Sequence, residues 1–214
     1  MNTGRVLTAI LTFTPAAALI VLLPGPDTLV VLRNLLRHGR RRATLTVLGV
    51  LSGLAVWVSA AAFGLSAILR ASHDAYTGLR IAGAIYLLWL GVSSLRSKVT
   101  ALPDPAEEVV RAQRRGLLGS GFAAGLATDL LNPKVGVFFV TFLPGFIPTG
   151  ESVGVTSMLL GAIFIAETAL YFAVLLLLAG RVTGWMQNAK IRRRLDRATG
   201  CVLIAFGMRL AVEP

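Results

Sequence analysis

The stretch "LLPGPDTLVVL" (Leu22–Leu32) belongs to an apolar run that extends from residue 6 to residue 32 and is long enough to cross a lipid bilayer. Its middle holds Pro24, Gly25 and Pro26, and Asp27 follows directly. Proline lacks the N–H that an inner helical residue donates, and a charge at the centre of a membrane helix is costly. The stretch therefore predicts a membrane helix that is interrupted within the bilayer.

The composition of the whole chain is that of an integral membrane protein. Hydrophobic residues make up 55% of the 214 residues and charged residues 14%, and the mean hydropathy is +0.75. The formal net charge is +11, but the basic residues form short clusters between apolar runs and have no interleaved aromatic residues. This distribution argues against a nucleic-acid partner and favours membrane lipid headgroups.

The apolar runs predict an all-α integral membrane protein with six transmembrane helices. The third and the sixth run are short, and the third is flanked by arginines that can reach the membrane surface. The runs cover residues 6–32, 43–69, 77–95, 116–142, 152–180 and 198–211.

The positions of the basic residues predict the orientation of these helices. Three alternate connections hold 16 of the 21 lysines and arginines. Cytoplasmic loops carry such an excess, so we expect both chain termini on the outside.

Three helices precede and three follow a polar, proline-containing segment, which we expect to be a cytoplasmic linker (residues 99–115). An odd number of helices in each half forces the second half to enter the membrane in the opposite orientation. We therefore predict two inverted three-helix repeats, residues 1–98 and residues 116–214, each with a broken first helix.

The second break is predicted in "DLLNPKVGVFF" (residues 129–139), at the place in the second half that matches the PGP stretch. Asn132 can cap free N–H groups at a helix start, and Pro133 suits the first helical position. Two breaks at equivalent positions predict a shared binding site near the middle of the membrane. The alternative is that both are structural proline kinks.

Four ionisable residues lie deepest in the predicted spans: Asp27, Asp129, Lys134 and Glu167. Buried acids can exchange protons, and Lys134 could pair with an acid or hold a substrate carboxylate. Glu167 has no charged neighbour on its own helix, which favours it for proton exchange. The alternative for these residues is a structural ion pair or a capped carboxylate.

Two G-x-x-x-G patterns, Gly49 with Gly53 and Gly121 with Gly125, predict close helix packing within one chain or across a dimer. No nucleophile elbow, P-loop, H-E-x-x-H or cysteine cluster is present in the sequence. The sequence thus predicts no enzyme, no cofactor and no metal site.

Four stretches of the chain resemble a known protein family. The stretches at 24–53, 79–97, 121–147 and 197–210 are similar to the lysine exporter and homoserine/threonine resistance (LysE/RhtB) family. Pro24 to Asp27 match its first signature, and Asn132 to Lys134 match its second. The chain departs from many relatives at Asp27, where they have asparagine, and at Leu54, where they carry a polar or acidic residue.

The resemblance implies a six-helix exporter of amino acids or related small metabolites in the bacterial inner membrane, driven by the proton gradient and dimeric. We expect the substrate carboxylate to meet a half-helix N-terminus and Lys134, and Asp27 or Glu167 to carry the proton. Two other classes stay open: a passive channel or lipid-handling protein, with the breaks lining a pore or groove, and an assembly partner without transport.

Overall fold

The computed structural model describes residues 3–22, 24–65, 73–96, 120–148 and 150–178, with residues 197, 200–202, 204–205 and 207–208. Throughout these ranges the regular structure is helical and no residue lies in a strand, which confirms an all-α fold for the described chain. The elements are α1 (Thr3–Leu22), α2 (Pro26–Ala60), η1 (Ala61–Leu65), α4 (His73–Arg96), α6 (Phe122–Leu130), α7 (Pro133–Val137), η2 (Phe138–Phe142), η3 (Leu143–Phe146) and α8 (Val153–Leu177).

Three helices in the described ranges are long and apolar enough to cross a membrane: α1, α2 extended to Gly64, and α8. The pair Phe122–Leu130 and Pro133–Phe146, bent by 52°, makes a fourth span if it is taken as one. Within the residues that the structure describes, α4 is not among these candidate spans. Half of the sixth predicted helix, residues 198–211, lies outside the described residues, and its described residues are helical.

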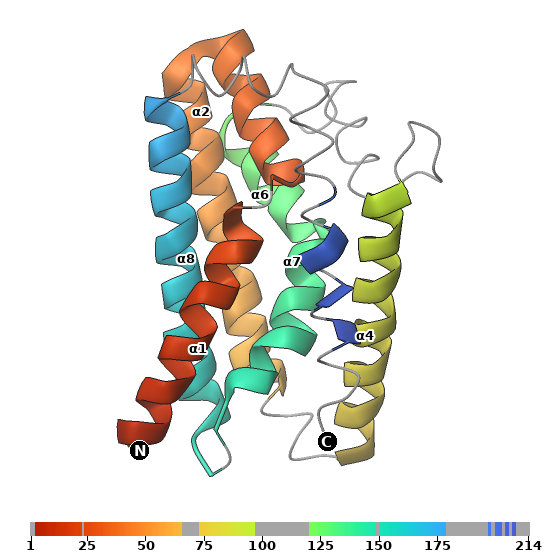
Figure 1. Ribbon diagram of the computed structural model, residues 1–214. Coiled ribbons are helices and arrows are strands. Elements are labelled where there is room, and N and C mark those ends of the chain that lie inside the picture. The colour runs from red at the N-terminus through yellow and green to blue at the C-terminus, as the bar shows by residue number, and fades with distance from the viewer. Residues whose placement is uncertain are drawn as a thin grey trace.

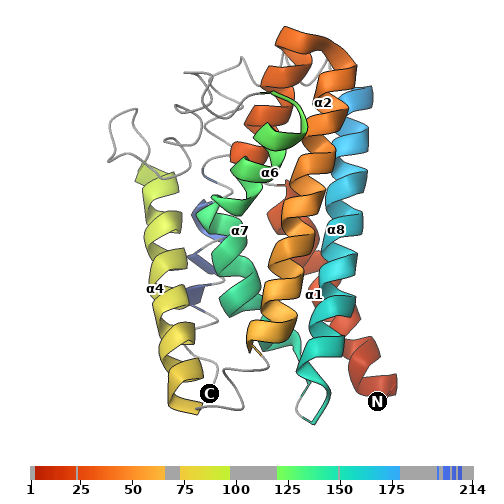
Figure 2. The same ribbon diagram turned by 180° about the vertical axis from the view of Figure 1, so that it is seen from behind.

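The helices form one bundle in which consecutive spans alternate in direction (Figure 1). α1 and the first part of α2 rise, the rest of α2 descends, α4 rises, α6 and α7 descend, and α8 rises again. Figure 2 shows from behind that α6 and α8 flank α2, and that α4 stands at the opposite edge from α8. The described C-terminal residues lie along α4, with Gly200 near Leu95 and Gly207 near Leu88.

The connection between the first two predicted spans, residues 33–42, is helical. α2 runs through this segment and reverses at Gly39, the one residue in it with non-helical angles (φ 76°, ψ 179°). Side chains rarely tolerate this conformation, so a glycine suits the reversal. Hydropathy marks the point where a helix leaves lipid, and an arginine-rich helix can continue beyond that point.

The predicted break in the first span is confirmed between Leu22 and Pro26. Pro24 has no N–H and cannot donate to the carbonyl of Ile20, four residues earlier. The Lys134 Nζ donates to that carbonyl instead, at 3.0 Å. A side chain from the second half of the sequence thus satisfies a backbone group that the first break leaves open.

The predicted break in the later span is also confirmed, between Leu130 and Pro133. Asn132 is the N-cap of α7, and its Oδ1 accepts a hydrogen bond from the Lys134 backbone N–H at 3.1 Å. Pro133 occupies the first helical position, where no N–H is required. The cap expected from the sequence is the one that forms.

Glycines allow α2 and α6 to pack backbone against backbone. Gly49 lies against the backbone of Phe122 and Leu126, and Gly125 lies against the Thr46 carbonyl and the Val50 nitrogen. Of the two expected roles for these glycines, the contacts support packing within one chain. Below the breaks, six phenylalanines form an aromatic core between α1, α7–η3 and α8: Phe13, Phe138, Phe139, Phe142, Phe146 and Phe164.

Gly125→Ala tests this packing. The added Cβ would lie 3.0 Å from the Val50 nitrogen and closer still to the Thr46 carbonyl oxygen, so α2 and α6 must separate. We expect the free energy of unfolding in detergent to fall by about 1–3 kcal/mol. Gly78→Ala in α4 is the matched control, because its Cβ would meet no atom of the described residues within 4 Å. Equal stability of the two variants would contradict the packing role.

The substitute donor at the first break can be tested with a double-mutant cycle. Lys134→Met should lower the free energy of unfolding by about 1 kcal/mol, because the Ile20 carbonyl loses its donor. In a Pro24→Ala background a backbone N–H is available four residues after Ile20, so the loss should shrink by about 0.5–1.5 kcal/mol. Pro15→Ala, within α1, is the control background and should show no coupling. An identical loss in both backgrounds would contradict the substitution of donors.

Candidate functional site

The two helix breaks are joined by one side-chain hydrogen bond. Asn132 Nδ2 donates to Asp27 Oδ2 at 2.7 Å, across 105 residues of sequence. The Asn132 side chain is 2% exposed, and its oxygen is already used to cap α7. With the oxygen committed as an acceptor, the amide nitrogen is the group that faces Asp27. Asn132 therefore starts one half-helix and holds the start of the other.

A cavity of about 50 Å³ lies where the breaks meet. This volume holds a few waters, since a single water needs roughly 10–15 Å³ by the same kind of measure, and it is far smaller than typical ligand pockets. An amino acid could bind only if the walls moved apart. The polar lining is Asp27, Thr28, Asp129, Asn132, Lys134, Thr168 and Tyr171, and the rest is Ile20, Val21, Gly25, Val50, Leu54, Val135, Phe138, Phe164 and Phe172.

Asp129 is the most unusual polar group of this pocket. It is fully buried in the last turn of α6, and its side chain lies directly against Gly53 of α2. Neither carboxyl oxygen has a hydrogen-bond partner among the described residues. A buried carboxyl requires a donor, and the negative end of a helix gives an acid no support. The carboxyl is therefore either neutralised by a proton or accepts hydrogen bonds from a water or a ligand.

Asp27 differs from Asp129 because it is partly satisfied. It stands in the first turn of α2, where the helix dipole favours a negative charge. One of its oxygens accepts from Asn132, and the other is buried without a hydrogen-bond partner among the described residues. The next residue, Thr28, shares a hydrogen bond of 3.2 Å with the hydroxyl of Tyr171 on α8. This bond ties the start of α2 to the opposite wall.

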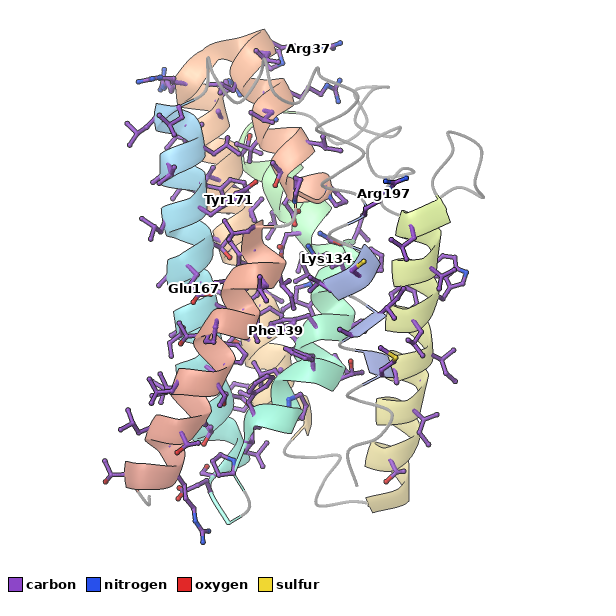
Figure 3. The ribbon with its side chains drawn as sticks, in the orientation of Figure 1. Arg37, Lys134, Phe139, Glu167, Tyr171 and Arg197 are labelled. Carbon is purple, nitrogen blue, oxygen red and sulfur yellow. The ribbon has the colours of Figure 1, made fainter. Side chains whose placement is uncertain are left out.

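Lys134 and Tyr171 lie at the level of the breaks, on α7 and α8 respectively (Figure 3). The Lys134 ammonium lines the pocket while it donates to the Ile20 carbonyl. It is thus a cation in the pocket wall whose position is fixed by the end of α1. The geometry allows it to attract a carboxylate that enters the pocket.

The structure separates Glu167 from the other predicted site residues. Glu167 is half-buried on α8, below Tyr171 in Figure 3, and it does not line the pocket. Its neighbour Thr168 does, because adjacent helical residues point about 100° apart. Of the other predicted residues, Gly25 lines the pocket, and Pro24, Pro26 and Pro133 shape the backbone around it.

Sequence reasoning missed Thr168 and Tyr171, which line the pocket, and Trp57, which braces it. Thr168 and Tyr171 share the spacing of three and four residues with Phe164 and Phe172, and this stripe on the predicted fifth helix was the available signal. The Trp57 indole donates to the Asp129 carbonyl at 3.3 Å, and its ring lies on Gly136. It therefore holds both sides of the second break.

The chain is similar to known transport proteins over most of its length. Residues 18–214 match the family model "LysE type translocator". The chain is 30% identical to the threonine efflux protein of Escherichia coli K12 over 193 residues, covering 89% of this chain and 91% of that protein. It is 30% identical to the leucine efflux protein of Klebsiella pneumoniae over 210 residues, covering 94% and 93%.

The uncharacterized membrane protein YrhP of Bacillus subtilis is also 30% identical, over 209 residues that cover 96% of this chain and 99% of YrhP. No solved structure matches the chain significantly. The family consists of transporters, so the chain is a membrane transport protein and not an enzyme. With apolar helices that can span a bilayer and a match over almost its whole length, the chain belongs to the LysE type translocator family.

Proposed function

We propose that this chain exports an amino acid, or a small derivative of one, across the bacterial inner membrane in exchange for protons. The observation that carries the proposal is the hydrogen bond from Asn132 to Asp27, because it joins two interrupted helices at a polar pocket inside an apolar bundle. The relatives named for threonine efflux and leucine efflux support an amino-acid substrate.

In this mechanism the substrate carboxylate lies against the Lys134 ammonium, near the start of α2. The positive end of a long helix and a nearby cation both favour an anion there. An acid in the protein carries the proton in the opposite direction. Because the cavity is small, the walls must separate to admit substrate and close again before release on the other side.

The proposed architecture is six helices in two inverted repeats, residues 1–98 and 116–214, joined by a cytoplasmic linker at 99–115, with both termini outside. Support comes from the opposite directions of α1 and α6, each of which ends at a break (Figure 1). Arg37 lies at the end of the bundle where α2 reverses (Figure 3), which fits a basic cytoplasmic face. A homodimer and bound membrane lipids remain part of the proposal.

Proton-coupled export is tested with purified protein in liposomes that contain labelled leucine or threonine. A pH gradient, acidic on the side that receives the amino acid, should drive saturable efflux, and a protonophore should abolish it. Empty liposomes are the control. Flux that needs no gradient and does not saturate would favour a passive channel, and no flux of any tested amino acid or derivative would contradict amino-acid export.

The bond between the breaks is tested by exchanging its partners. Asn132→Asp should lower gradient-driven flux at least tenfold, because two carboxylates would face each other and the donor to Asp27 would be lost. The double variant Asp27→Asn with Asn132→Asp should recover much of the flux, since the new amide can donate to the new carboxylate, which can still cap α7. Flux of the double variant as low as that of Asn132→Asp would contradict the role of this bond.

A further inference from the structure

We infer that Asp129 binds a proton and the substrate ammonium group in turn, with the same two oxygens, so that the two compete for one carboxyl. This inference rests on the proposed function and assigns the exchange of proton and substrate to one residue. It concerns any substrate with a primary ammonium group next to a carboxylate. The chemical basis is that a bound proton removes the negative charge of the buried carboxyl, whereas an ammonium group balances that charge and donates N–H bonds to it.

The first argument is the missing donor. Asp129 is fully buried, both of its oxygens are buried, and neither has a hydrogen-bond partner among the described residues. The Trp57 indole donates to the backbone carbonyl of Asp129 and so provides no hydrogen bond to the carboxyl group. Asp129 also lines the pocket between the breaks. A ligand that enters this pocket is therefore in a position to supply the hydrogen bonds.

The second argument compares the three acids near the site. Asp27 already accepts a hydrogen bond from Asn132 and stands at the favourable end of α2. Glu167 is half-buried and does not line the pocket. Of these three acids, Asp129 alone combines complete burial, a place in the pocket wall and two oxygens without a hydrogen-bond partner among the described residues.

The other titratable groups of the pocket set the charge balance. They are Asp27 from α2, Lys134 from α7 and Tyr171 from α8, whereas α1 contributes only Ile20 and Val21 to the wall. Lys134 is placed to face the substrate carboxylate. Asp129, on α6, is then the acid whose carboxyl is open to the other, cationic end of the substrate.

The exchange conserves charge at Asp129. When substrate binds, the O–H bond of the neutral acid breaks and the proton leaves through the pocket water. The carboxylate then accepts N–H···O bonds from the ammonium group, and a neutral ion pair replaces the neutral acid. Since neither state leaves an isolated charge in the bundle, both are tolerable in a low-dielectric site. Because Asp129 holds either a proton or the substrate at any one time, proton flux and substrate flux are coupled in opposite directions.

The test counts protons released when the purified full-length protein binds leucine, by calorimetry in two buffers of different ionisation enthalpy. We expect release of about one proton per leucine at acidic pH, and an apparent affinity that weakens by up to about tenfold per unit of falling pH. The matched ligand 4-methylpentanoate has the same carbon skeleton without the amino group, and should release none. Equal release with both ligands would overturn the assignment, whether or not any variant folds.

Asp129→Asn should weaken leucine binding at least tenfold and abolish proton release. Glu167→Gln is the matched control, the same acid-to-amide change outside the pocket, and should keep the proton release; thermal unfolding verifies that both variants are folded. Efflux by Asp129→Asn with the pH dependence of the unchanged chain would overturn the role of Asp129 and leave the proposed function standing. Absence of gradient-driven efflux by the unchanged chain would overturn both.

Discussion

A backbone polar group inside a lipid bilayer must find its partner within the protein, and the fold of this chain depends on that requirement. Each proline-containing break removes helical hydrogen bonds at a depth where water is scarce. The second break supplies a donor that the first lacks, because Lys134 donates to the Ile20 carbonyl; Asn132 also binds the Asp27 side chain. The two halves of the sequence therefore meet at the breaks because a backbone carbonyl needs a donor there, even without a bound ligand.

The pocket follows from this meeting together with the packing of α2 on α6. Glycines let these helices approach closely, and Gly53 leaves just enough space for the Asp129 side chain. A larger residue at that position would fill the space that the carboxyl occupies. The same close packing that stabilises the bundle thus places an acid, without a donor, in the wall of a small cavity.

The breaks could be predicted because proline and asparagine act through local rules: a missing N–H ends one helix and a side-chain cap starts the next. The role of Glu167 could not be judged in the same way. α8 is apolar on nearly all sides, so the sequence gives little indication of which side faces the pocket, and Thr168 and Tyr171 face it instead. The partners of Asp27 and Lys134 depend on contacts over more than a hundred residues, which no local pattern contains.

The bonds that cross the pocket also indicate how it could open. The cavity is too small for an amino acid, so the surfaces at the breaks must separate. Three hydrogen bonds hold the pocket walls together: Asn132 with Asp27, Lys134 with the Ile20 carbonyl, and Thr28 with Tyr171. All three involve side chains, and a typical hydrogen bond contributes only about 0.5–1.5 kcal/mol net. A substrate that offers a carboxylate and an ammonium group can replace such bonds while every helix keeps its own backbone pairing, which is why broken helices suit a site that must open repeatedly.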